Sequence, residues 1–161
     1  MTTFQEDLKM GRLYERMALE FFLVKDKGNE KEVVFPPEGA FKPWDFKYDG
    51  VPYEVKSDRY GWRTNAMAIE FICSGKPSGI TTTEAKDWFY FMMNPNTQQP
   101  VCGMRIPVKR LRKYIADKKP LIKTGGDNGA SHFYIVPRED FNDCLLFGKP
   151  FTSSSCQIIL E

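Results

Sequence analysis

The sequence predicts an α/β protein in which a mixed β-sheet is flanked by α-helices. Hydrophobic residues recur at helical spacing near the N-terminus and after Pro107, and short runs of aromatic and β-branched residues lie between. The resulting order (helix, strands, helix, strand, helix, strand) is typical of a sheet covered by helices. With 161 residues and 42% hydrophobic content, the chain is expected to form one domain over residues 1–161.

The first elements are a long helix and a hairpin. Residues 4–25 predict a helix, residues 33–35 a short strand and residues 36–43 a proline-containing loop. Asp49-Gly50 is a strong signal for a two-residue hairpin turn. Pairing the flanking strands around this turn sets Phe46 opposite Tyr53.

The later elements alternate strands and helices. Met67–Cys73 predicts a strand, and Thr81 and Glu84 have the spacing of a capping box, which predicts a helix over 81–89. Pro107 suits the first turn of a helix running to about Asp117. The remaining expectations are a strand or helix end at 90–93, strands at 101–106 and 131–137, a loop at 124–129, and an irregular tail over 139–161 with one more short element.

The sequence also bears on the cellular location of the protein and on the redox state of its cysteines. No apolar run is long enough to span a bilayer, and the N-terminus lacks a signal-peptide layout, so the protein is expected to be intracellular and cytoplasmic. Cys73, Cys102, Cys144 and Cys156 lie far apart and are expected to be reduced and mostly buried. The single histidine, His132, argues against zinc sites and histidine-based catalysis.

Basic residues concentrate in one stretch, although the net charge is only +2. Between Arg105 and Lys123, eight basic residues face one acid, an excess of seven that is typical of a surface that binds a phosphate backbone. The segment 57–65 adds arginines among aromatic residues, a mixture that grips backbone and stacks on bases. The residues expected to contact DNA are Arg59, Arg63, Lys86, Lys109, Arg110, Arg112 and Lys113.

The hairpin carries the candidate chemistry. Pairing the strands outward from the Asp49-Gly50 turn places Asp45 opposite Glu54, with Lys56 on the same face as Glu54. Like charges that face each other destabilise a sheet unless a cation lies between them. Mg²⁺ held by Asp45, Glu54 and the Val55 carbonyl would activate a water that Lys56 positions or deprotonates. The alternative is a solvated hairpin in which Lys56 only pairs with Glu54 or Asp45.

The same residues resemble a nuclease family. "PWD" at 43–45 and "EVK" at 54–56 resemble the motif of the PD-(D/E)XK nuclease superfamily, with Trp44 inserted, and residues 69–88 resemble small phage- and virus-encoded members. The resemblance covers roughly residues 10–90. It implies a restriction-endonuclease-like core, Mg²⁺ or Mn²⁺ as cofactor, DNA as partner, a homodimer or higher homo-oligomer, and a glutamate on the first helix, for which Glu20 is the first candidate and Glu15 the second.

The expected function is therefore a metal-dependent DNA endonuclease, structure-selective in the manner of the similarly small Holliday-junction resolvases. Asp45, Glu54, Lys56 and Glu20 would form its site. A sequence-specific homing or restriction-type endonuclease is the alternative within this class. A non-catalytic nucleic-acid-binding protein of the same fold and a protein-interaction domain are the alternatives outside it.

Overall fold

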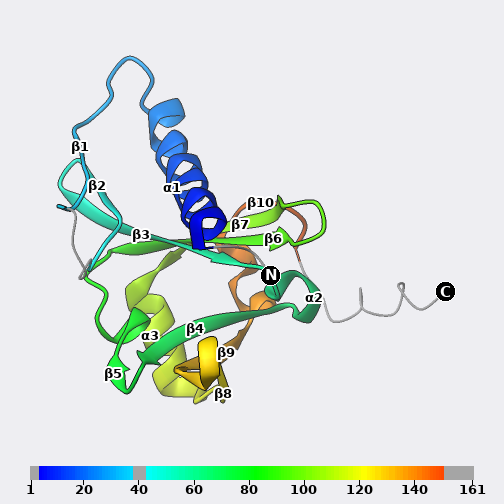
Figure 1. The fold of residues 1–161 in the computed structure, drawn as a ribbon. Coiled ribbons are helices and arrows are strands. Elements are labelled where there is room, and N and C mark those ends of the chain that lie inside the picture. The colour runs from blue at the N-terminus through cyan, green and yellow to red at the C-terminus, as the bar shows by residue number, and fades with distance from the viewer. Residues whose placement is uncertain (1–3, 38–42, 151–161) are drawn as a thin grey trace.

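The computed structural model describes residues 4–37 and 43–150 and shows a mixed α/β fold (Figure 1). The strands of this part of the chain form two sheets. In chain order, the elements are α1 (Phe4–Lys25), β1 (Val33–Val34), β2 (Phe46–Tyr48), β3 (Val51–Asp58), α2 (Gly61–Thr64), β4 (Ala66–Cys73), β5 (Lys76–Pro77), the 3₁₀ turn η1 (Gly79–Thr81), β6 (Asp87–Asn94), β7 (Gln99–Pro107), α3 (Val108–Lys118), β8 (Leu121–Gly125), η2 (Asp127–Gly129), β9 (Ser131–Pro137), η3 (Arg138–Cys144) and β10 (Leu145–Phe147).

The main sheet has the strand order β1-β2-β3-β6-β7-β10. The pairing of β3 with β6 is parallel, and the other neighbours are antiparallel, so the predicted mixed sheet is confirmed. The second sheet, in the order β5-β4-β9-β8, is antiparallel throughout. Because β4 and β9 were expected to join one common sheet, this division into two sheets is a correction.

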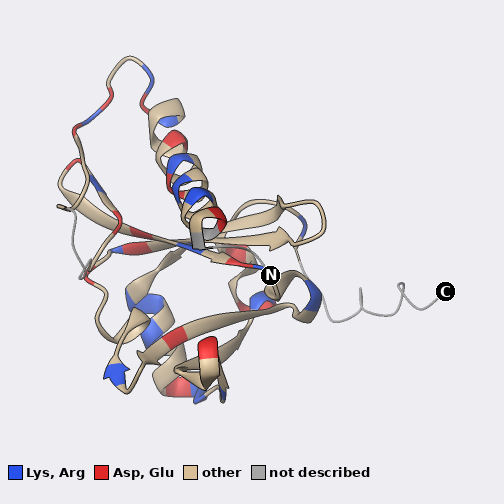
Figure 2. Ribbon diagram, viewed as in Figure 1, with Lys and Arg blue, Asp and Glu red and all other residues tan. Residues whose placement is uncertain are grey.

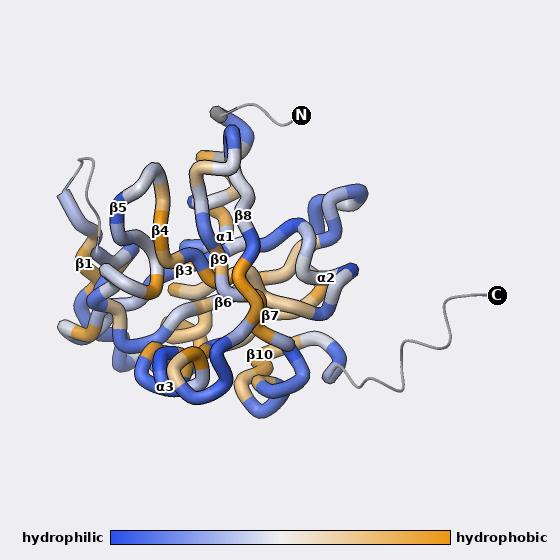
Figure 3. Tube along the Cα trace, turned by 90° about the horizontal axis from the view of Figure 1, so that it is seen from below, coloured by the Kyte–Doolittle hydropathy of each residue, from blue (hydrophilic) through white to orange (hydrophobic). Residues whose placement is uncertain are grey.

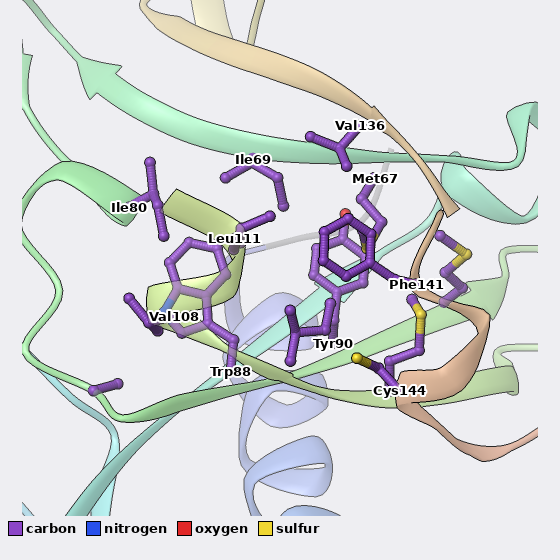
Figure 4. Close-up of a cluster of buried hydrophobic side chains, with 14 of the residues drawn as sticks. Met67, Ile69, Ile80, Trp88, Tyr90, Val108, Leu111, Val136, Phe141 and Cys144 are labelled. Carbon is purple, nitrogen blue, oxygen red and sulfur yellow. The ribbon is translucent and has the colours of Figure 1, made fainter. Parts of the chain in front are cut away.

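Two hydrophobic cores lie on opposite faces of the main sheet. On one face, α1 packs its aromatic side chains against β2, β3 and β6. The other face is covered by α3 and the second sheet, and Figure 4 shows the side chains between them. Figure 3 shows hydrophobic stretches along β4 and β7, whereas α3 alternates hydrophilic and hydrophobic segments. The buried aromatic residues of the α1 core include Tyr14, Phe22, Phe46, Tyr53, Phe89 and Phe91.

The strand β6 separates the two cores. Seven of its eight residues are buried, and its side chains alternate between faces, with Phe89 turned toward α1 and Trp88 and Tyr90 toward the second sheet. Hydrogen bonding to β3 on one side and β7 on the other fixes this strand. A strand buried on both faces reads as a continuous apolar run, which explains the sequence "WFYFMM".

The helix predicted over residues 81–89 is wrong. Thr81 closes the short turn η1, its hydroxyl donates to the Phe71 carbonyl rather than capping a helix, and from Asp87 the chain is in β6. The capping-box spacing is a local signal, and burial of this segment between two strands overrides it.

The other element predictions agree well with the structure. The helix over 4–25 and the helix after Pro107 are confirmed, as are the strands at 33–35, 67–73, 101–106 and 131–137, with no strand end more than two residues away from its expected position. The strand β8, by contrast, was not expected. Within the described ranges, no helix is long and apolar enough to cross a membrane. Cys102 and Cys144 are buried free thiols and Cys73 is half-buried, whereas Cys156 lies outside the described residues.

Candidate active site

The β2–β3 hairpin positions the candidate residues. Asp49 and Gly50 both adopt left-handed backbone conformations, with φ of 51° and 74°, as a two-residue hairpin turn requires. The expected register is confirmed for the first three pairs, ending at Phe46 opposite Tyr53. The fourth expected pair is not part of the ladder, because the Asp45 N–H donates to the Tyr53 carbonyl at 2.8 Å.

Asp45 is nevertheless attached to β3 beside Glu54. Its Oδ2 accepts a hydrogen bond of 2.6 Å from the backbone N–H of Val55. This contact puts the Asp45 carboxylate against the peptide that joins Glu54 to Val55. Asp45 is therefore held against β3 at the residue that follows Glu54, through a side-chain contact rather than through strand pairing.

Glu54 and Lys56 lie on the face of β3 that is turned away from α1. Tyr53 enters the α1 core, so alternation along the strand directs Glu54 and Lys56 to the opposite face. Glu54 is only 8% exposed, and its Oε1 forms an ion pair with Lys56 Nζ. The Lys56 ammonium also lies 5.3 Å from the centre of the Trp88 ring. The lysine is thus held between an acid and an aromatic face.

Thr83 completes the surroundings of Glu54. Its hydroxyl donates to Glu54 Oε2 and accepts hydrogen bonds from the Ala85 N–H at 3.2 Å and from Trp88 Nε1 at 3.3 Å. Glu54 therefore has one oxygen on Lys56 and the other on Thr83. Sequence reasoning missed Thr83, because it assigned this segment to a helix and a threonine 29 residues from Glu54 carries no local signal.

Arg112 holds the Thr83 segment in place. From α3, its guanidinium donates to the Ile80 carbonyl at 3.0 and 3.1 Å and to the Thr83 carbonyl at 2.9 Å. These bonds tie both ends of the 80–83 loop to the helix. Arg112 was expected to contact DNA, but the structure directs its donors to this loop, which makes it a positioning residue for Thr83.

Glu20 does not join this set. It lies on α1 beside Phe21 and borders an apolar groove of about 470 Å³ that Phe89 and Phe147 also line. Phe89 belongs to the α1 core, whereas Lys56 lies against Trp88 on the other face. The main sheet therefore separates Glu20 from Glu54 and Lys56.

Of the other basic residues of α3 that were expected to contact DNA, two pair with acidic residues and one is exposed. Arg110 is turned toward η3, where it forms two bonds with Asp143 and one with the Asp140 carbonyl. This contact lowers the pKa of Asp143. Lys113 forms an ion pair with Asp117 in the next turn, and Lys109 is exposed. Figure 2 shows basic residues on α3, as well as on α1, where acidic residues alternate with them.

The remaining predicted DNA contacts lie near β3 and β6. Lys86, exposed, directly precedes β6 and its backbone N–H bonds to the Pro52 carbonyl. Arg59 follows β3 and lines a cleft together with Lys56. Arg63 is exposed in α2, with its guanidinium 5.2 Å from the Trp62 ring. Arg59 is the one of these residues that shares a cavity with the candidate site.

This cavity, which we call the inter-sheet cleft, has a volume of about 440 Å³. Side chains of both sheets line it, among them Lys56 and Trp88 on the main sheet and Glu70 and Phe133 on the second. Glu70 Oε1 accepts a hydrogen bond of 2.7 Å from the Ser78 hydroxyl. Through this cleft, water and small molecules can reach Lys56.

Asp58 closes one end of the cleft. Its Oδ1 accepts the N–H groups of Tyr60 and Gly61 at 2.7 and 2.8 Å, and its Oδ2 accepts the Tyr90 hydroxyl at 2.6 Å. Burial and then the Asp58 charge raise the pKa of Tyr90 well above its ordinary value. Tyr90 in turn accepts the Ala68 N–H at 3.0 Å. Asp58 therefore ties the end of β3 to the start of α2 and to β6, and the Tyr90 hydroxyl extends this network to β4 of the second sheet.

The donor set fits a hard divalent cation. Among the described residues, no group of three or more histidine, cysteine, aspartate or glutamate side chains is placed to hold a metal. Mg²⁺ typically binds proteins through only one or two carboxylates and completes its shell with water and phosphate oxygens. Asp45, which bonds to the N–H of the Glu54–Val55 peptide, and Glu54 are the two carboxylates that would serve in this way.

The chain matches no protein-family model and no curated protein sequence.

Proposed function

We propose that this protein is a metal-dependent endonuclease that hydrolyses phosphodiester bonds in DNA and has a restriction-endonuclease-like core. The layout of the fold supports the core assignment. A long first helix covers one face of a mixed sheet, the hairpin β2–β3 carries the acids, and β3 runs parallel to the central strand β6.

One observation carries the proposal. Asp45 bonds to the Val55 N–H and Glu54 forms an ion pair with Lys56, so both contacts involve the three consecutive residues 54–56 of β3. Two carboxylates and an ammonium held along this short stretch would provide ligands for a cation and a donor for a phosphate. Glu54 is 8% exposed and is paired with both Lys56 and Thr83, so it is not a solvated surface acid.

The proposed reaction is an in-line displacement at phosphorus. A water oxygen forms a bond to phosphorus, the bond to the leaving sugar oxygen breaks, the water loses a proton to solvent, and the leaving oxygen gains one. Lys56 donates N–H bonds to the attacking water or to the phosphate oxygens on which negative charge grows. Asp45 and Glu54 would hold Mg²⁺ or Mn²⁺, which would supply Lewis-acid polarisation of the phosphate and lower the pKa of a water.

The test is cleavage of a panel of labelled DNAs in Mg²⁺ or Mn²⁺. The panel contains a linear duplex, a single strand, a flap, a four-way junction and genomic DNA, so that the preferred substrate separates a junction-resolving enzyme from a sequence-specific one. We expect metal-dependent cutting by the wild type and its loss in Asp45→Asn. Glu20→Gln is the matched control, because Glu20 lies on the opposite face of the main sheet.

Two results would contradict the proposal. One is cutting that survives in Asp45→Asn at the wild-type rate, which would point to a contaminating nuclease. The other is salt-sensitive binding of DNA without cutting of any substrate, which would favour a non-catalytic nucleic-acid-binding protein.

A further inference from the structure

We infer that the inter-sheet cleft is a subsite for one unpaired nucleotide, with its base stacked on Tyr60. This inference rests on the proposed nuclease function and names the class of DNA that the site takes: strands with an unpaired nucleotide next to the bond that is cut. Its starting point is that Lys56, the proposed phosphate donor, lines the same cleft as Tyr60 and Arg59.

Tyr60 has a solvent-exposed aromatic side chain on a hydrogen-bonded backbone. It is 79% exposed, yet its backbone is fixed on both sides. Its N–H donates to Asp58 Oδ1 at 2.7 Å, and its carbonyl accepts the Arg63 N–H at 3.0 Å. An exposed aromatic ring on a fixed backbone is a stacking surface that loses little conformational freedom when a base binds.

The other aromatic residue of this segment has a different role. Trp62 packs against the core between the sheets, and its indole nitrogen is buried without a hydrogen-bond partner. Gly61, between the two, allows this arrangement, since a Cβ there would lie 2.7 Å from the Ala66 carbonyl oxygen. The chain thus turns Trp62 inward and leaves Tyr60 at the cleft.

The size and lining of the cleft fit a nucleotide. Its volume of about 440 Å³ is in the range of small-ligand sites, roughly 300–1,000 Å³. Lys56 on β3 and Arg59, which directly follows β3, would attract the phosphate. Phe133 and Glu70 on the second sheet offer a second apolar surface and a hydrogen-bond acceptor for the base. A base in an intact duplex is stacked and paired, so it must leave the stack to enter.

The experiment uses single-stranded DNA with one 2-aminopurine, in Ca²⁺ instead of Mg²⁺ so that binding is read without cutting. We expect the wild type and Tyr60→Phe to quench the 2-aminopurine fluorescence. Tyr60→Ala is expected to quench weakly and to bind the strand about 5- to 150-fold less tightly, the range for losing one stacked base. Phe35→Ala is the matched control, because Phe35 is also an exposed aromatic residue but lies next to β1, at the far edge of the main sheet.

The outcomes separate this inference from the nuclease proposal. Wild-type affinity and quenching in Tyr60→Ala, or an equal loss in Phe35→Ala, would overturn the subsite even if DNA is cut in a Lys56-dependent way. A Tyr60-dependent quench with no cleavage of any DNA would support the nucleotide subsite and remove the hydrolytic function. Affinity for a fully paired duplex is expected to be the same in Tyr60→Ala as in the wild type.

Discussion

Replacing Thr83 with valine removes the hydroxyl that donates to the buried Glu54 carboxylate and keeps the shape of the side chain. A hydrogen bond to a charged group contributes about 1.5–3 kcal/mol, and the Ala85 N–H and Trp88 Nε1–H lose an acceptor as well. We therefore expect Thr83→Val to lower the free energy of unfolding by about 2–4 kcal/mol.

The measurement is urea unfolding followed by tryptophan fluorescence, since the buried Trp88 contacts Thr83 directly. With a urea dependence of roughly 2 kcal/mol per molar, the midpoint of Thr83→Val is expected to fall by about 1–2 M. Thr83→Ser keeps the hydroxyl and is expected to stay near the wild type. Thr81→Val removes only an exposed bond to the Phe71 carbonyl, so its cost should be about 0.5–1.5 kcal/mol.

A double-mutant cycle tests whether the effect acts through Glu54. Combining Thr83→Val with Glu54→Gln is expected to cost less than the sum of the single changes, with a coupling of about 0.5–3 kcal/mol. The reasoning is refuted if Thr83→Val unfolds at the wild-type urea concentration, or if the two substitutions add without coupling.

Three further predictions concern the residues around the site. Arg112→Ala frees the carbonyls of Ile80 and Thr83 and is expected to increase hydrogen exchange across residues 80–85 and to lower activity, whereas unchanged exchange would count against its positioning role. The pKa of Tyr90 is raised in the folded state, so its contribution to stability is full below the unfolded pKa of about 10 and is lost as the pH rises above that value. Between pH 8 and pH 11, the free energy of unfolding of the wild type should therefore fall by more than that of Tyr90→Phe. An equal fall in both proteins would contradict this prediction. Gly61→Ala would place its Cβ 2.7 Å from a backbone carbonyl, so we expect a lower melting temperature, and a variant as stable as the wild type would show that this close approach does not matter.

Local patterns predicted the parts of the fold that depend on neighbouring residues. The Asp49-Gly50 turn fixes the hairpin through its own backbone conformation, and the spacing of apolar residues set the bounds of α1. The sequence "TTTEAKDWF" gave a wrong helix prediction because its capping signal is local, whereas the burial of β6 depends on the neighbouring strands β3 and β7. The strand β8 was missed because four of its five residues are exposed and show no alternation.

For the candidate site too, contacts between residues close in sequence could be predicted and contacts between distant residues could not. The hairpin brings Asp45, Glu54 and Lys56 together within twelve positions of the sequence, so their proximity could be predicted. Thr83 and Arg112 reach the site through tertiary packing, each 29 residues from its partner, and no spacing rule connects them. Glu20 was chosen because the family resemblance implies a glutamate on the first helix, and neither that resemblance nor the face of α1 reveals the side of the sheet on which the helix packs.

Single-turnover cleavage in Mg²⁺ by the wild type, Lys56→Ala and Lys25→Ala tests the central claim most directly. Lys56 pairs with Glu54 at the proposed site, whereas Lys25 lies at the end of α1 on the other face of the main sheet. We expect Lys56→Ala to cut at least about 100-fold more slowly than the wild type and Lys25→Ala to match the wild type. Equal cleavage by all three proteins, or no cleavage by the wild type on any DNA, would contradict the assignment of Asp45, Glu54 and Lys56 as a nuclease site.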